Sequence, residues 1–182
     1  AYSVPGQMVN NFTSLDFPPG EQFKYQDVTY NLAGLIIETV SGQSYEDFLF
    51  ENIFEPLGME NSGVDRNWKL SDMARGYYDA ESDLEVNPYY TFAEGSIYST
   101  VEDMLLWDQA LYTDKLVPLS VLEEMFSPQT PVPDGEYYSF DGSTGWSYGF
   151  GWFIAPEKKG YVLHGGTLPG FRAEFRRYTE DN

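Results

Sequence analysis

The stretch Pro18-Pro-Gly-Glu-Gln-Phe-Lys-Tyr25-Gln-Asp27 leads directly into the apolar run Tyr30-Asn-Leu-Ala-Gly-Leu-Ile-Ile-Glu38. Pro-Pro-Gly predicts a rigid turn, because proline fixes one backbone angle and glycine accepts the left-handed conformation that tight turns need. The spacing of apolar residues in the following run predicts a mostly buried helix over 29–40, closed by Gly42 as a C-terminal cap. A tyrosine and two polar residues are therefore expected at a surface, just before a buried helix.

Tyr25 is the first candidate for chemistry. The normal pKa of a tyrosine is about 10, so a phenol becomes a useful base only where nearby positive charge stabilises the phenolate. The structural alternative is that Tyr25 packs with Phe23 at the helix entrance, and the spacing alone favours this alternative.

Helices are predicted for most of the first part of the chain. Ser44 is expected to cap a second helix, with Asp47 as its capping-box partner and Pro56 as its stop. Two further helices are predicted over 101–111, where Ser99 or Thr100 is the cap, and over 119–126.

Strands and loops make up the rest. The segments 148–155, 160–163 and 171–178 alternate aromatic and small residues and predict three antiparallel strands. Loops are expected at 1–17, at 60–95 with a short hairpin around 80–83, and at 127–147. Helices followed by strands predict an α+β fold. The mainly helical region would cover 1–147 and the strands 148–182, together forming one domain or the larger part of one.

Composition excludes several classes of function. The 182 residues carry a net charge of −19, which argues against nucleic acid or an anionic membrane as partner, since both attract clustered Lys and Arg. With no Cys there are no disulfides or thiolate sites, and a single His makes a zinc centre improbable. We therefore expect no metal and no cofactor, and an acidic surface that keeps the protein in solution.

The second candidate site is the segment Leu163-His164-Gly-Gly-Thr167-Leu-Pro-Gly170. A histidine at a strand end followed by two glycines presents its ring and an open backbone edge to a bound molecule. Backbone N–H donors held ready in this way are typically worth about 2.7 to 4 kcal/mol in acyl transfer. The structural alternative is a strand end with a glycine turn and a surface histidine.

Several segments, in their order along the chain, resemble motifs of the serine β-lactamase and penicillin-binding protein family. Tyr25-Gln-Asp27 is similar to the Tyr-x-Asn motif, and Gly95-Ser-Ile-Tyr-Ser99-Thr-Val-Glu-Asp103 to a Gly-Gly-x-x-Ser-Thr-x-x-Asp segment in which Glu94 replaces the first Gly. Tyr148-Gly-Phe-Gly-Trp152 resembles a Tyr-Gly-x-Gly-Trp strand. His164-Gly-Gly166 resembles the third motif, which is Lys-Thr-Gly in penicillin-recognising members and His-x-Gly in many esterase-like and peptidase-like members. The resemblance covers nearly all of the chain after residue 17.

The resemblance implies a partial β-lactamase/transpeptidase-like fold and an acyl-enzyme mechanism on an ester, amide or lactam. It assigns Tyr25, Asp27 and His164 to catalysis, with Tyr25 as a proton shuttle. It assigns substrate binding to Gln26, Gly165, Gly166 and Thr167, where the Thr167 N–H would form half of an oxyanion hole.

Two departures from the family pattern indicate the subtype. Gln26 and Asp27 replace Ser and Asn, which places a carboxylate where a substrate carboxylate would be repelled. His164 replaces the Lys of penicillin-recognising members, which weakens carboxylate recognition further. An esterase-like or peptidase-like activity is therefore favoured over a true β-lactamase.

The Ser-x-x-Lys nucleophile motif of the family does not occur in the 182 residues, since Glu21, Arg66, Tyr112, Ala155 and Pro156 stand three residues before the five lysines. The chain is therefore expected to be the C-terminal part of such a hydrolase, an incomplete catalytic domain that is inactive alone. A sheet of three strands with uncovered edges would pair with the missing N-terminal segment or self-associate. The alternative is a non-catalytic binding module of the same fold. The resemblance favours the cell envelope or secretion, although the sequence itself does not define the compartment.

For two groups of side chains, a structural role is favoured over a functional role. Three arginines on one predicted strand are expected to form salt bridges with residues such as Glu174: Arg172, Arg176 and Arg177. A set of aromatic loop residues is expected to pack in the core and against loops rather than line a substrate groove: Tyr77, Tyr78, Tyr89, Tyr90, Phe92 and Tyr98.

Overall fold

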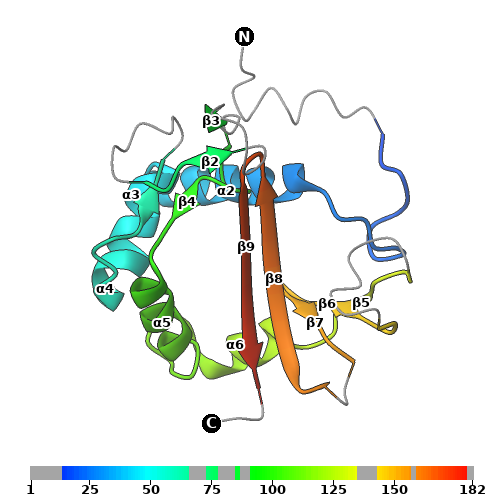
Figure 1. Cartoon of the computed structure of the whole chain (residues 1–182). Helices are drawn as coiled ribbons and strands as arrows, with labels where there is room; N and C mark the ends of the chain where they lie inside the picture. The colour runs from blue at the N-terminus through cyan, green and yellow to red at the C-terminus, as the bar shows by residue number, and fades with distance from the viewer. Residues whose placement is uncertain are drawn as a thin grey trace. The chain divides into compact units, whose positions relative to one another are not determined.

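The structure, a computed structural model, describes residues 14–65, 73–77, 85–86, 91–134, 143–156 and 159–179. The α+β prediction is confirmed, because helices occupy the first part of the described chain and an antiparallel sheet the last (Figure 1). Of the predicted loops and aromatic residues, 1–13, the hairpin tip at 80–83, Tyr78, Tyr89 and Tyr90 lie outside the described residues.

Helix α2 (Asp27–Ser41) forms where the apolar run predicts it, and Gly42 ends it in the left-handed conformation with φ of 73°. The prediction that this helix is mostly buried is wrong. Only Asn31 and Gly34 are buried, whereas Leu32, Ile36 and Val40 are 41%, 54% and 82% exposed. These three residues follow one another at intervals of four and therefore form one exposed apolar stripe along the helix.

Helix α3 (Tyr45–Leu49) begins at Ser44, whose Oγ accepts from the N–H of Asp47 at 3.1 Å and thereby confirms the predicted cap. The prediction that Pro56 stops this helix is wrong. The helical path continues through a π-helical turn, η1 (Phe50–Phe54), into α4 (Glu55–Leu57). Pro56 lies in the first turn of α4, and Gly58 ends the helix in the left-handed conformation.

Helix α5 (Val101–Ala110) is capped by Thr100, whose Oγ1 accepts from the N–H of Asp103 at 3.2 Å. The buried carboxylate of Asp103 in turn accepts from the N–H of Asn61 at 2.8 Å and from Ser62 Oγ at 2.7 Å. These bonds tie the start of α5 to the chain before β1 (Gly63–Val64), which pairs antiparallel with β4 (Ile97–Tyr98). The fourth predicted helix is α6 (Leu119–Met125).

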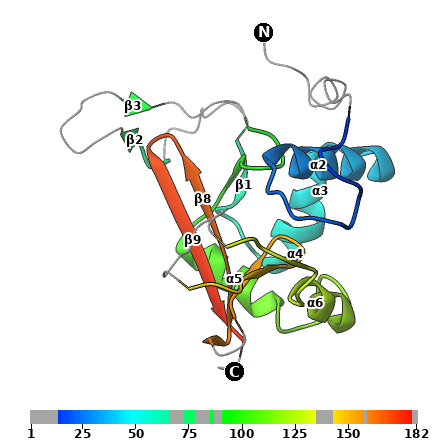
Figure 2. The same ribbon diagram turned by 90° about the vertical axis from the view of Figure 1, so that its right-hand side faces the viewer.

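The predicted set of three strands is wrong in number, because the main sheet of the described residues has five strands in the order β5-β6-β7-β8-β9. Its strands are β5 (Thr130–Pro131), β6 (Ser147–Tyr148), β7 (Phe153–Ile154), β8 (Tyr161–Leu168) and β9 (Phe171–Tyr178). The last two run side by side as a long hairpin (Figures 1 and 2). A separate pair, β2 (Gly76–Tyr77) with β3 (Glu85–Val86), flanks the predicted hairpin at 80–83.

The segment 148–155 is a hairpin and not the single strand that its alternation predicts. Gly149 N–H donates to the Trp152 carbonyl at 2.8 Å, and Gly151 has a φ of 82°, so the chain reverses between β6 and β7. A Cβ on Gly149 would lie 2.3 Å from the Met125 carbonyl oxygen. Both glycines of the Tyr-Gly-Phe-Gly-Trp segment are thus explained by backbone geometry.

The chain divides into two compact units. Unit 1 comprises 1–16, 25–111 and 167–171, and unit 2 comprises 17–24, 112–166 and 172–182. The core of unit 1 is built from Tyr45, Leu49, Phe54, Leu57, Met59, Phe92, Ala110 and Leu111. The core of unit 2 is built mainly from the sheet, with Trp146, Tyr148, Trp152, Phe153, Tyr161, Val162 and Leu163.

Two arginines of β9 make different kinds of interaction. Arg176 pairs with Glu174 at 2.8 Å, as the predicted salt bridge requires. Arg177 is instead buried, with its guanidinium 3.9 Å from the ring centroid of Tyr112 and 5.0 Å from that of Phe126. A guanidinium between two aromatic rings is a cation–π arrangement, so this arginine belongs to the packing of unit 2.

Candidate functional site

Tyr25, Gln26 and Asp27 lie together at the start of α2 in unit 1. Tyr25 is half-buried, and Gln26 and Asp27 are exposed. Gln26 is the N-cap residue in an extended conformation, and its carbonyl accepts from the N–H of Thr29 at 3.0 Å. Asp27 occupies the first turn, where the helix dipole favours a negative charge. The preceding Pro18–Glu21 turn closes through a 3.3 Å bond, with Gly20 at a φ of 85°.

The buried amide of Asn31 connects α2 to the loop before β4. Its Oδ1 accepts from the N–H of Glu94 at 3.3 Å, and Glu94 itself accepts from the N–H of Phe92 at 2.7 Å. One turn along the helix, a Cβ on Gly34 would lie 2.5 Å from Ala93 Cβ and 2.8 Å from the Phe92 ring. The loop 91–96 is therefore held against the helix that begins with Asp27, both by a hydrogen bond and by close packing.

His164 lies on β8 in unit 2, half-buried among aromatic rings. Its Nε2 is 3.3 Å from the hydroxyl of Tyr148 on β6. The ring centroid of Phe153 on β7 is 5.6 Å from that of His164 and 4.8 Å from that of Tyr148. The ring centroid of Phe23 is 5.2 Å from that of Tyr148.

Burial lowers the pKa of His164 below its usual 6.5, and a hydrogen bond with the backbone of Gly165 opposes this to a smaller extent. Desolvation disfavours the charged imidazolium, so the neutral ring predominates at pH 7. A neutral imidazole offers a hydrogen bond but no fixed positive charge.

The remaining predicted residues continue along β8. Gly165 is half-buried, while Gly166 and Thr167 are exposed. A Cβ on Gly166 would meet no atom within 4 Å, so packing does not require glycine here and the space beside the strand is open. Thr167 belongs with unit 1, together with the hairpin turn that follows it.

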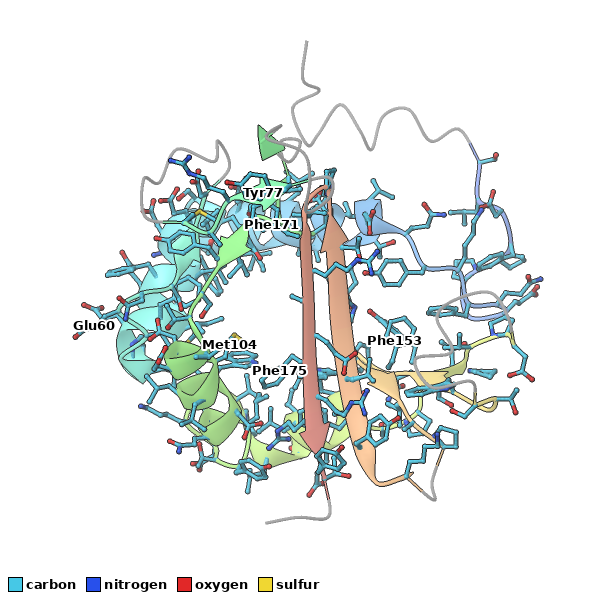
Figure 3. The ribbon with its side chains drawn as sticks, viewed as in Figure 1. Glu60, Tyr77, Met104, Phe153, Phe171 and Phe175 are labelled. Atoms are coloured by element: carbon cyan, nitrogen blue, oxygen red, sulfur yellow. The ribbon has the colours of Figure 1, made fainter. Side chains whose placement is uncertain are left out.

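The turn between β8 and β9 is held by close backbone contact within unit 1. Gly170 has a φ of 78°, and a Cβ there would lie 2.7 Å from the backbone of Gly76 and Tyr77. A Cβ on Gly76 would lie 2.4 Å from the Phe171 ring. Figures 2 and 3 show β2 beside the turn, with Tyr77 and Phe171 close to each other.

The predicted site residues are divided between the two units. Tyr25, Gln26, Asp27 and Thr167 belong to unit 1, and His164, Gly165 and Gly166 to unit 2. Sequence reasoning missed Tyr148 and Asn31 as residues that contact or brace these groups. Tyr148 was visible as the first residue of the Tyr-Gly-Phe-Gly-Trp segment, and Asn31 as a polar residue inside an apolar run.

Among the described residues, no group of three or more His, Cys, Asp or Glu side chains is placed to hold a metal ion. The described helices include none with the length and apolarity to cross a bilayer.

Comparison with known proteins identifies the family. The Beta-lactamase family matches residues 10–182. A penicillin-binding protein of Bacillus subtilis (strain 168) is 34% identical over 197 residues, which cover 97% of this chain and 42% of that protein. A D-aminopeptidase of Brucella ovis is 25% identical over 92% of this chain and 31% of its own length. The octameric penicillin-binding protein homologue of Pyrococcus abyssi superposes with a TM-score of 0.76 at 30% identity, over 89% of this chain and 37% of that one.

The chain belongs to the β-lactamase family of serine hydrolases, which includes penicillin-binding proteins and D-aminopeptidases. It spans less than half the length of the curated relatives named above.

Proposed function

We propose that this chain supplies the Tyr and His-Gly-Gly part of a serine hydrolase active site, whose nucleophile lies on a Ser-x-x-Lys segment outside these 182 residues. The observation that carries the proposal is the position of Tyr25-Gln-Asp27 at the start of α2, with Tyr25 half-buried and Gln26 and Asp27 exposed, in a chain that matches the family over 10–182. Alone, the chain would be inactive, since an acyl-enzyme needs a serine nucleophile with an adjacent base.

In this mechanism the serine attacks the carbonyl of an ester, amide or lactam, and its proton passes to Tyr25. A nearby lysine of the nucleophile segment would stabilise the phenolate, because opposite charge lowers the pKa of a phenol. The proton then returns to the leaving group, and water or an amine releases the acyl group. Gln26 and Asp27 would contact the substrate or that lysine, Gly165 and Gly166 would bind substrate, and the Thr167 N–H would donate to the oxyanion.

The favoured substrates are neutral amides or esters rather than penicillins. The neutral ring of His164 provides no fixed cation for a substrate carboxylate, and the carboxylate of Asp27 would repel one. The relationship to a D-aminopeptidase supports an amide-cleaving or ester-cleaving activity.

The test joins this chain to its nucleophile segment, which reading the codons upstream of Ala1 would reveal. We expect a fluorophosphonate to label a serine in the complete protein, and a fluorescent penicillin to label it poorly. Tyr25→Phe should lower the labelling rate by about 10²- to 10⁴-fold, the usual contribution of a general acid–base residue. Tyr112→Phe is the matched control, because Tyr112 is 43% exposed and its ring stacks on Arg177, which a phenyl ring preserves.

A start codon close to Ala1, with no labelling, would instead support the second candidate, a binding module of the same fold. Equal labelling of the wild type and Tyr25→Phe would remove Tyr25 from the mechanism. Rapid hydrolysis of a chromogenic cephalosporin would overturn the preference for neutral substrates.

We further propose that the natural partner of the chain is the nucleophile segment, with self-association through the sheet edges as the competing arrangement. The edge strands of the described sheet are β5 and β9, and the side chains of Arg172, Glu174 and Arg176 on β9 disfavour edge-to-edge pairing. Sedimentation of the chain with and without the nucleophile segment separates the two arrangements. For the complete protein we propose an envelope or secreted location.

A further inference from the structure

We propose that Tyr148 is the positioning residue of His164, donating its hydroxyl proton to Nε2 and so holding the imidazole as the neutral tautomer that carries its proton on Nδ1. The proposal rests on the proposed function for its catalytic meaning, because it assigns the form in which His164 serves that site. The hydrogen bond and the tautomer themselves do not depend on that function.

The first observation is geometric. The hydroxyl of Tyr148 is 3.3 Å from Nε2, and Tyr148 is 8% exposed, so its ring has little freedom to move. Phe23 at 5.2 Å and Phe153 at 4.8 Å pack on that ring and fix its orientation. The hydroxyl is therefore aimed at the imidazole by packing rather than by a flexible side chain.

The second observation is the hydrogen bond between the imidazole and the backbone of Gly165, which favours the protonated ring. A bond with this effect joins a ring N–H to a carbonyl oxygen, since an N–H donor would favour the neutral ring instead. Because Nε2 faces Tyr148, Nδ1 is the nitrogen left to donate to the backbone. In the neutral ring one nitrogen donates and the other accepts, so Nε2 is left to accept from Tyr148.

Among the described neighbours of His164 on the main sheet, few charged groups compete with this arrangement. The described neighbours on β6 and β7 are Ser147, Tyr148, Phe153 and Ile154, of which only Tyr148 titrates. On the adjacent strand β9 the charged residues are Arg172, Glu174, Arg176 and Arg177. Glu174 and Arg176 pair with each other, and Arg177 lies over Tyr112 and Phe126.

The charge state of His164 bears on the class of substrate that the site would accept. A tyrosine that donates to Nε2 stabilises the neutral imidazole, and burial acts in the same direction. The group of the substrate that approaches His164 is then expected to be an uncharged amide or ester group rather than a carboxylate. Tyr148 would enforce this preference without touching the substrate.

The experiment is nitrogen-15 NMR of the imidazole, and it needs no enzymatic activity. The chain has a single histidine, so its ring resonances are unambiguous, and His164→Gln confirms their assignment. In water a neutral histidine carries its proton mostly on Nε2. We expect the opposite pattern here, with the protonated-nitrogen shift on Nδ1 and the unprotonated shift on Nε2.

Tyr148→Phe removes the hydroxyl and keeps the ring that packs on Phe23 and Phe153. It should lower the ratio of Nδ1–H to Nε2–H tautomer by about fivefold, the factor that corresponds to one net hydrogen bond, and raise the titration midpoint. Tyr161→Phe, a buried tyrosine on the same sheet, should change neither quantity.

Each other outcome overturns the proposal. An Nε2–H tautomer in the wild type contradicts it directly, and this measurement stands even if Tyr148→Phe fails to fold. An unchanged tautomer ratio in Tyr148→Phe shows that the hydroxyl does not position the ring. A lowered midpoint shows that the hydroxyl accepts from the imidazolium instead. Because none of these results involves labelling, they are separate from a failure of the proposed hydrolase function.

Discussion

At the scale of single residues, buried polar side chains connect segments that are far apart in sequence. Asn31 is 1% exposed and accepts from the N–H of Glu94, 63 positions further along the chain. Asp103 is 3% exposed and accepts from Asn61 and Ser62. Loss of the partner of either group would lower the free energy of unfolding, because a buried polar group without a hydrogen bond retains its full desolvation penalty.

This reasoning predicts the effect of Asn31→Ala. The substitution leaves the N–H of Glu94 without its acceptor, and we expect the free energy of unfolding to fall by about 1–3 kcal/mol. Urea denaturation measures the change. Asn52→Ala is the matched control, since Asn52 is exposed and bonds only to Phe48 one turn away, and it should change stability by less than about 0.5 kcal/mol. Equal losses in the two variants would contradict the bracing role of Asn31.

At the scale of elements, glycines allow strands and turns to approach more closely than any other residue permits. The turn of the β8–β9 hairpin lies against β2 through Gly76 and Gly170, and the β6–β7 turn lies against Met125 through Gly149. The first of these contacts fixes the hairpin turn directly after Thr167. The position of a proposed oxyanion donor therefore depends on a glycine that is 91 positions earlier in the chain.

Gly76→Ala should destabilise this contact, because its Cβ would lie 2.4 Å from the Phe171 ring. Overpacking of this kind typically costs about 1–3 kcal/mol. Chemical denaturation should show the loss, and hydrogen exchange should place it in the β8–β9 turn.

Two further variants sharpen this test. Gly95→Ala is the control, because the nearest atom to its Cβ would be Thr91 Cγ2 at an ordinary 3.5 Å. Adding Phe171→Leu to Gly76→Ala should recover part of the lost stability, since the clash is with the far end of the Phe171 side chain. If the double variant is less stable than the sum of the single losses predicts, the close contact is not the cause.

At the scale of the whole molecule, the net charge of −19 is the dominant property. Like charges on a compact chain repel one another, and salt screens this repulsion over a Debye length that falls from about 30 Å at 0.01 M to about 8 Å at 0.15 M.

We therefore expect the melting temperature to rise with sodium chloride over this range. A gain of about 1 kcal/mol corresponds to roughly 2–4 °C for a chain of this size. Calorimetry at several salt concentrations measures the shift, and sucrose at equal osmolarity controls for effects of the solvent. A melting temperature that is flat or falls with salt would mean that attractive ion pairs outweigh the net repulsion.

The sequence by itself determined the α+β class, the extents of α2, α5 and α6 to within two residues, and the caps at Gly42 and Ser44, and it narrowed the cap of α5 to Ser99 or Thr100. It also determined the family, because the motifs occur along the chain in the same order as in the family. These features are local, because a cap or a helical period depends on residues within about four positions of one another.

The tertiary structure alone decided burial and long-range partnership. The apolar run of α2 proved largely exposed, the segment 148–155 proved to be a hairpin, and Tyr148 proved to be the hydrogen-bond partner of His164. An apolar pattern shows which face of a helix is apolar but not which residues cover that face. A strand pattern does not show where the chain reverses direction. Both are set by contacts between distant residues, which only the folded chain brings together.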